Sequence, residues 1–93
     1  MYDTVAKIRV MPKDINVNLE EINEKIKEIL NKFENSKFHS SEIKPIAFGL
    51  KALEVTLLIT EEKSELDKIE EEILKIEGVG NIDEIDIHLI SNL

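Results

Sequence analysis

The chain has 93 residues and a mass of 10.7 kDa, which suits a single domain spanning residues 1–93. Its 12 lysines and arginines are outnumbered by 20 aspartates and glutamates, so the net charge is −8 and a nucleic acid is a poor candidate partner. Cysteine is absent, which excludes disulfides and thiolate sites, and no apolar run approaches the ~18 residues of a membrane span. We therefore expect a cytoplasmic protein without nucleic-acid or membrane contacts.

The first half of the chain predicts a strand followed by a helix. An alternating apolar pattern indicates a strand over residues 4–10, which Pro12 is expected to end because proline has no N–H for a neighbouring strand. Apolar residues at helical spacing then predict a helix over residues 19–34. Asn18 and Glu21 have the spacing of a capping box at its start.

The second half predicts two strands, a helix and a last strand. Residues 37–45 show a weak, mostly polar alternation typical of an edge strand. The alternation over residues 51–59 is strong and becomes apolar on both sides, as expected of a central strand. Ser64 is expected to cap the second helix, and Gly78 to stop it in the left-handed conformation. A closing strand is expected over residues 85–89.

This order of elements predicts the α+β, ferredoxin-like split βαββαβ sandwich, with a four-stranded antiparallel sheet and two helices on one face. Right-handed crossovers would place the first and third strands centrally and the second and fourth at the edges. The other face of the sheet is expected to be open and to carry Lys7, Arg9, Lys51 and Glu54 among its side chains. Because this fold hosts many functions, the function has to be argued from sites.

The sequence contains no recognisable catalytic constellation. His39 and His88 lack the spacing of a metal site, and the acidic runs at residues 61–62 and 70–72 are interpreted as solvated surface. No serine has a histidine partner that the sequence can place. We therefore expect no enzymatic activity, no catalytic residue, no cofactor and no bound metal, which leaves a binding module.

One segment departs from ordinary edge-strand sequence. Residues 45–53 read Pro-Ile-Ala-Phe-Gly-Leu-Lys-Ala-Leu and place an aromatic residue and a glycine in the hairpin between the second and third strands. A ring at such a position either packs inward or anchors a partner. The residues alone favour packing of Phe48 against the end of the sheet, with Gly49 supplying a positive φ or a bulge.

Together with Val10-Met11-Pro12, Ile76-Glu77-Gly78-Val79 and the short hydrophobic C-terminus, this segment resembles the archaeal elongation factor 1-beta family over essentially the whole chain. The resemblance implies the split sandwich and a guanine-nucleotide exchange factor that promotes GDP release from elongation factor 1-alpha, a translational GTPase. It also implies that the partner-binding residues are Phe48, Gly49, Leu50 and Lys51 in the hairpin and Ser91, Asn92 and Leu93 at the C-terminus.

The chain departs from the pattern at its next-to-last residue. Eukaryotic domains of this kind typically have a lysine there, which reaches toward the magnesium site of the GTPase, whereas this chain has Asn92. Lys51, Asn92 and apolar contacts that distort the switch region therefore remain as alternative means of displacing magnesium.

Two other classes of function share this order of elements. An ACT-like regulatory domain that senses a small molecule is the first alternative, although such domains usually have a glycine-bearing first strand–helix loop, which residues 11–17 do not provide. The second is a structural protein that pairs its edge strands into oligomers.

Overall fold

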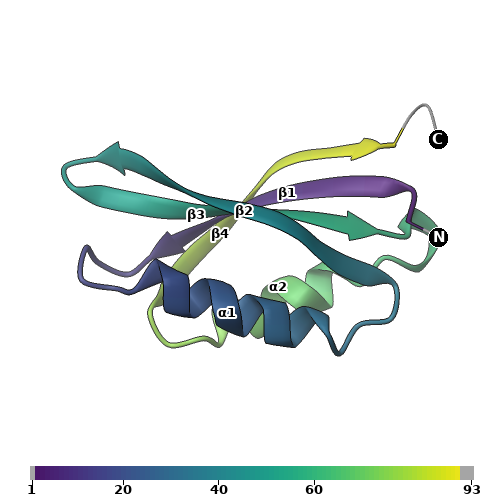
Figure 1. The fold of residues 1–93 in the computed structure, drawn as a ribbon, viewed down its shortest axis with the longest axis horizontal. Helices are drawn as coiled ribbons and strands as arrows, with labels where there is room; N and C mark the ends of the chain where they lie inside the picture. The colour runs from purple at the N-terminus through teal and green to yellow at the C-terminus, as the bar shows by residue number, and fades with distance from the viewer. Residues whose placement is uncertain (1, 91–93) are drawn as a thin grey trace.

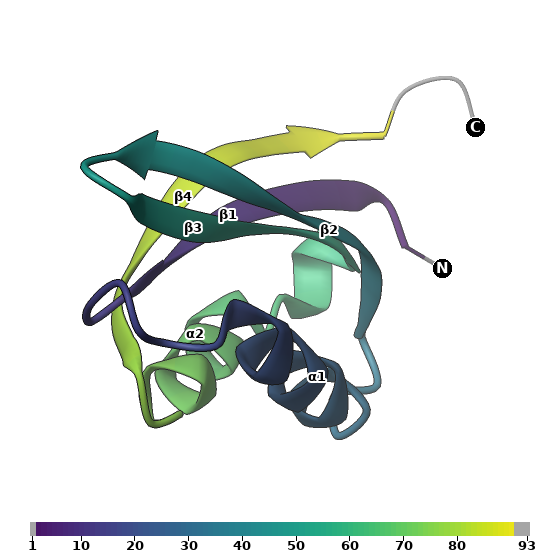
Figure 2. The ribbon, with the colours of Figure 1, turned by 60° about the vertical axis from the view of Figure 1, so that its left-hand side comes forward.

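The computed structural model describes residues 2–90, in which a four-stranded antiparallel sheet is covered on one face by two α-helices (Figure 1). The strand order is β2-β3-β1-β4, so β1 and β3 are central, and the predicted sandwich topology is confirmed. Figure 2 shows both helices on the same side of the twisted sheet. The elements are β1 (Thr4–Pro12), α1 (Leu19–Leu30), β2 (Ser36–Ala47), β3 (Leu50–Ile59), a 3-10 turn (Glu61–Lys63), α2 (Leu66–Leu74) and β4 (Val79–Leu89).

Strand β1 is two residues longer than expected, and Pro12 pairs with Val79 as its last residue. Proline is tolerated there because β3 pairs with β1 only as far as Val10, so the end of β1 has a neighbouring strand on one side only. The capping prediction for α1 is confirmed, since the Glu21 N–H donates to the Asn18 side-chain oxygen at 3.1 Å.

The predicted end of the first helix at residue 34 is wrong by four residues. The helix α1 ends at Leu30, because the hydrogen bonds that follow have the shorter spacing of a 3-10 turn. The Lys32 and Phe33 N–H groups donate to carbonyls three residues earlier rather than four. Phe33 nevertheless packs against the core, which explains why its apolar character appeared to extend the helix.

Helix α2 begins differently from the prediction. Its N-cap is Glu65, and Ser64 instead accepts the Leu66 N–H at 3.3 Å in a local turn that follows the 3-10 segment. Gly78 has a φ of +99°, as predicted, and a Cβ there would also lie 3.0 Å from a Val17 methyl group. The prediction that Gly78 stops this helix is wrong, because α2 already ends at Leu74 with Lys75 as its C-cap. Strand β4 begins at Val79, six residues before the expected start, because its first half is a mostly polar edge segment without clear alternation.

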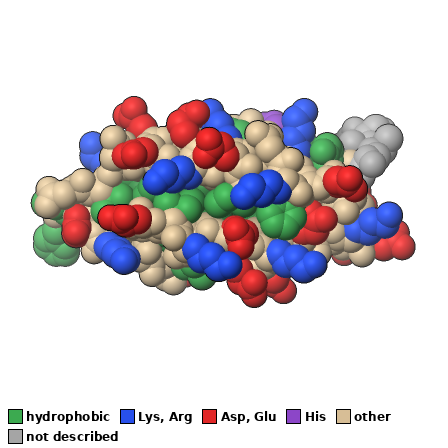
Figure 3. Space-filling model, turned by 90° about the horizontal axis from the view of Figure 1, so that it is seen from below, with side chains coloured by type: hydrophobic (Ala, Val, Ile, Leu, Met, Phe, Trp, Pro, Cys, Tyr) green, Lys and Arg blue, Asp and Glu red, His purple; other side chains and the backbone are tan. Residues whose placement is uncertain are grey.

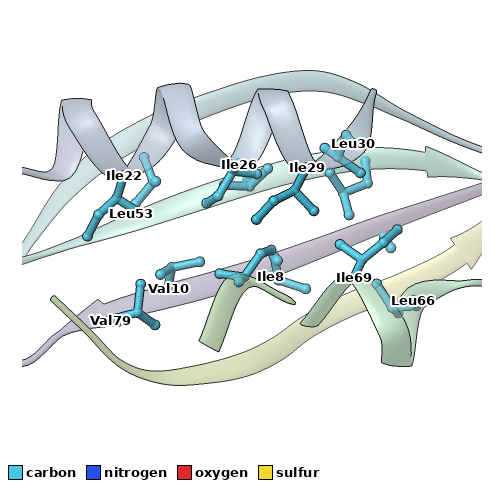
Figure 4. Packing of buried hydrophobic residues seen from close by; sticks show 14 of the residues in the cluster. Ile8, Val10, Ile22, Ile26, Ile29, Leu30, Leu53, Leu66, Ile69 and Val79 are labelled. Atoms are coloured by element: carbon cyan, nitrogen blue, oxygen red, sulfur yellow. The ribbon is translucent and has the colours of Figure 1, made fainter. Parts of the chain in front are cut away.

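The hydrophobic core fills the space between the sheet and the helices (Figure 4). Ile8 from β1, Ile26 from α1 and Ile69 from α2 are fully buried and belong to one cluster. Burial of each such side chain contributes about 1.5–3 kcal/mol, so the fold is stabilised independently of the loops and of the open sheet face. The other core residues are Ala6, Val10, Leu19, Ile22, Ile29, Leu30, Leu53, Val55, Leu57, Ile59, Leu66, Ile73 and Val79.

The helix side carries both acidic and basic side chains (Figure 3). Figure 3 shows this face, with acidic and basic side chains interspersed around a narrow lengthwise band of hydrophobic side chains. Ion pairs at i,i+3 spacing, such as Lys27–Glu24 and Lys75–Glu72, lie on the exposed sides of the two helices. These pairs are solvated and add little to stability.

Candidate protein-binding site at the hairpin end

Strands β2 and β3 are joined by a two-residue turn. Ala47 pairs with Leu50, which leaves Phe48 and Gly49 as the loop. Their φ angles are +52° and +80°, so both residues are in the left-handed region, as a type I′ hairpin turn requires. This confirms the positive φ expected at Gly49, where the backbone angle rather than crowding requires glycine, since a Cβ would meet nothing within 4 Å.

The ring of Phe48 is fully exposed, with a relative accessibility of 102%. The expectation that Phe48 packs against the end of the sheet is therefore wrong, because a type I′ turn points its first residue away from both strands. Among residues 2–90, Phe48 is the one non-glycine residue with a positive φ, a conformation that costs about 1–2 kcal/mol. Asparagine suits this position far better than phenylalanine, so the ring is placed here at the expense of stability.

Other exposed aliphatic side chains surround the turn. Ile43 and Ile46 lie in the last part of β2, and Ile15 lies in the loop between β1 and α1; they are 38%, 47% and 64% exposed. Figures 1 and 2 both place this loop and the hairpin at the same end of the molecule. A hollow of about 480 Å³ separates them, and Ile15, Ile43 and Gly49 all line it. We call the turn, these aliphatic residues and the hollow the hairpin end.

Lys51 also lines this hollow. The sequence placed Lys51 on the open face of the sheet, and this is wrong because it shares the strand alternation of Leu53, which faces the helices. The open face is instead formed by Glu54, Thr56 and Leu58 along this strand. Leu50 is half-buried beside the turn, and two of the four expected hairpin residues, Gly49 and Lys51, line the hollow.

The expected C-terminal site residues Ser91, Asn92 and Leu93 lie outside the described residues. The last described residue is Ile90, whose N–H donates to the Asp3 carbonyl at 2.7 Å beside the N-terminus. Figure 1 places the C-terminal end of β4 opposite the hairpin along the longest dimension of the molecule, which is 40 Å. The structure therefore does not bring the hairpin and the C-terminal end of β4 together.

The centre of the open sheet face holds a buried carboxylate. Glu54 is 6% exposed, and its oxygens lie 3.1 Å from Arg9, 3.2 Å from Lys44 and 3.9 Å from Lys7. Burial favours the neutral acid, but hydrogen bonds from Arg9 and Lys44 outweigh it and hold the pKa of Glu54 below its usual value. This carboxylate is fully compensated within the chain.

A second group of titratable residues lies between α2 and β4. Asp67, Glu70 and Glu84 place carboxylate oxygens within 4.8 Å of one another. Burial, followed by the hydrogen bond with Glu84, raises the pKa of Glu70 to about 7. The interpretation of residues 70–72 as solvated surface is therefore wrong for Glu70. The sequence missed the cluster because Glu84 was not assigned to a strand.

The two histidines are exposed, as expected, and lie on the opposite edge strands β2 and β4. His39 contacts Ser40 at 3.1 Å, and His88 lies 2.8 Å from Asp86. Neither histidine is near the hairpin end. Among residues 2–90, no helix is long and apolar enough to span a membrane.

An exposed aromatic tip beside a hollow that is lined by both aliphatic and polar side chains is typical of a protein-binding domain. Residues 5–93 match the family model described as the EF-1 guanine nucleotide exchange domain, so the chain belongs to this family of translation elongation factors. It is 42% identical over 90 residues to elongation factor 1-beta of Archaeoglobus fulgidus and 38% identical over 91 residues to that of Methanosarcina barkeri. Both alignments cover 97% of this chain and the whole of the relative.

Solved structures of other proteins share the fold. The ACT domain of GTP pyrophosphokinase from Chlorobium tepidum superposes with a TM-score of 0.60 at 17% identity, covering 89% of this chain and 99% of that one. The C-terminal domain of MgtC from Mycobacterium tuberculosis gives 0.63 at 10% identity, covering 95% and 87%. At these identities the likeness concerns the fold alone, so it does not support the alternative of a small-molecule sensor.

Proposed function

We propose that this chain accelerates the release of GDP from elongation factor 1-alpha, so that GTP can replace it during translation elongation. The observation that supports this most directly is the fully exposed Phe48 ring, held outward on a turn of unfavourable conformation. Membership of the exchange-domain family supports elongation factor 1-alpha as the partner. The protein acts in the cytoplasm and needs no cofactor for this function.

Exchange requires differential binding rather than bond chemistry. A factor that binds the nucleotide-free GTPase more tightly than the GDP-bound form weakens GDP binding by the same ratio. A thousandfold effect takes about 4 kcal/mol of differential binding. Buried anchors at the centre of an interface contribute about 2 kcal/mol or more each, so the Phe48 ring and a few neighbours are sufficient in scale.

The partner surface in this proposal has two parts. Phe48 is the anchor, Gly49 and Leu50 set the turn that presents it, and Lys51 supplies a cation beside the hollow. Ser91, Asn92 and Leu93 form the second part. Because the hairpin and the end of β4 lie at opposite ends of the 40 Å axis, one GTPase that contacts both parts must extend along the factor.

The first test replaces the anchor. Phe48→Ala is expected to slow factor-stimulated release of a fluorescent GDP analogue from elongation factor 1-alpha at least tenfold, because the loss of a central anchor weakens binding to the nucleotide-free form. Leu74→Ala is a matched control, since Leu74 is 47% exposed on α2 and lies away from the hollow. The proposal fails if the wild-type chain leaves GDP release unchanged, and an active Phe48→Ala variant would remove the ring from the mechanism.

The second test removes the other part of the surface. Deletion of residues 91–93 is expected to reduce stimulated release even though position 92 is asparagine rather than lysine. Full activity of the truncated chain would assign exchange to the hairpin end alone. Full activity of Lys51→Ala together with a defect of Asn92→Ala would favour Asn92 over Lys51 as the group that disturbs magnesium.

A further inference from the structure

The hollow at the hairpin end has a second wall, to which the proposed function gives no role in binding the GTPase. This wall is the loop between β1 and α1, residues 13–18, which faces the hairpin across the hollow. Ile15 projects from it with 64% of its surface exposed, more than any other described large aliphatic residue. An isoleucine with this exposure on a loop tip forgoes about 1.5 kcal/mol or more of burial.

The loop is held in place on both sides of Ile15. Before it, the Lys13 N–H donates to the Gly78 carbonyl at 2.8 Å, and the Asp14 carboxylate accepts the Asn16 N–H at 2.8 Å. After it, Val17 packs against the core beside Gly78. Because these contacts fix the backbone, the side chain of Ile15 is presented without a large entropy cost when a partner binds.

The charges at the rim of the hollow are unbalanced. Asp14 and Glu20 both line it, and within residues 2–90 neither forms an ion pair. Lys51 supplies the one cation that lines it among the described residues. An occupant with its own positive charge would therefore be favoured over an acidic one.

We infer that this hollow receives a segment of elongation factor 1-alpha that inserts an aliphatic side chain between Ile15 and Ile43 and places a lysine or arginine near Glu20. This inference rests on the proposed function, and it adds the β1–α1 loop as a second wall of the binding surface. The hollow is continuous with the Phe48 turn through Gly49, so one partner surface reaches both. Its volume of about 480 Å³ accommodates a few side chains rather than a whole helix.

The test measures how GDP release depends on factor concentration. Ile15→Ala is expected to lower the initial slope of release rate against factor concentration about fivefold. The reason is the loss of an aliphatic contact that becomes buried when the GTPase binds. The rate at saturating factor should change less than the slope, because Ile15 contributes binding rather than nucleotide displacement. Leu74→Ala, which removes an exposed leucine away from the hollow, should stay within twofold of the wild type.

Glu20→Gln tests the charge of the occupant. This variant is expected to lower the slope about threefold at low salt and to behave like the wild type at high salt, because the lost attraction is screened. A low-salt slope equal to that of the wild type would overturn the assignment of a cationic partner residue. Circular dichroism of both variants establishes that α1 is intact.

The outcomes separate this inference from the proposed function. If Phe48→Ala is impaired while Ile15→Ala keeps a slope within twofold of the wild type, the inference is wrong and the proposed function stands. If the wild-type chain does not accelerate GDP release, the failure belongs to the proposed function. A fivefold loss in Ile15→Ala that Leu74→Ala does not show supports the second wall.

Discussion

The centre of the open sheet face and the hairpin end each contain an energetically unfavourable group, but only the group at the centre is compensated within the chain. At the centre, the buried carboxylate of Glu54 is surrounded by Arg9, Lys44 and Lys7, so that its charge is neutralised within the chain. At the hairpin end, Phe48 has an unfavourable φ and a fully exposed ring, and nothing within the described residues covers it. This difference supports the proposal that the hairpin end serves a partner, whereas the centre of the open face serves stability.

The largest effect on stability is expected when the buried carboxylate at the centre of the open face is removed. Glu54→Ala leaves three cations facing one another and is expected to lower the free energy of unfolding by about 2 kcal/mol, as measured by urea denaturation. Glu42→Ala is the control, because Glu42 is 66% exposed and contacts the same Lys44 at 3.6 Å; its effect should stay below about 0.5 kcal/mol. Equal effects of the two changes would contradict the role of burial.

Stimulated GDP release by folded Glu54→Ala should remain close to that of the wild type. A loss of exchange without a loss of folding would place the open face in the partner surface and remove the contrast between the two regions.

The next prediction concerns Phe48, where one substitution should raise stability and lower exchange activity. Phe48→Asn is expected to raise the free energy of unfolding by about 0.5–1 kcal/mol, because asparagine suits the first position of a type I′ turn. The same change should reduce stimulated GDP release at least tenfold, since the ring is lost. Thermal unfolding and the exchange assay measure the two quantities. A variant that is both more stable and fully active would refute a functional reason for the exposed ring.

The smallest expected effect concerns the acidic cluster between α2 and β4. The pKa of Glu70 is raised from 4.5 to about 7, so the folded state holds this proton more tightly than the unfolded state does. Stability is therefore lost as the pH rises from about 4.5 to about 7. Glu70→Gln, which mimics the protonated acid, should stabilise the protein by about 1 kcal/mol at pH 8, after allowance for solvent screening, and by little at pH 4.5.

Melting temperatures of Glu70→Gln and of the neighbouring, exposed Glu71→Gln at both pH values measure this effect. A gain of the same size at pH 4.5 and pH 8 would show that it does not come from titration of Glu70.

The topology could be predicted from the sequence because the hydrophobic periodicity of each segment indicates a strand or a helix, and the order of these elements defines the sandwich. The alternation in β1 and β3 and the Asn18 cap of α1 are properties of single elements, and all were confirmed. The errors arise where a neighbouring element decides the outcome. Pro12 continues β1 because only β4 pairs beside it, and the start of β4 is set by that same pairing rather than by alternation.

The sequence singled out the residues of the candidate hairpin site but not their arrangement in space. The sequence singled out Phe48 and Gly49, yet the exposure of the ring depends on a two-residue turn whose φ angles are both positive. Lys51 was assigned to the wrong face because the alternation was counted from the wrong residue of β3. The sequence did not single out Ile15, because one isoleucine in a polar loop has no distinguishing pattern. Its significance depends on the hairpin residues that line the same hollow.

The hydrogen bond from Ile90 to Asp3 has a practical consequence for experiments on this factor. It fastens the last described residue beside the start of β1, at the end of the molecule that is farthest from the turn (Figure 1). An affinity tag or a fused fluorescent protein at either terminus would therefore start near the Asp3–Ile90 hydrogen bond and leave the aromatic tip clear. Reporters intended to spare both surfaces belong on the outward side of the helices.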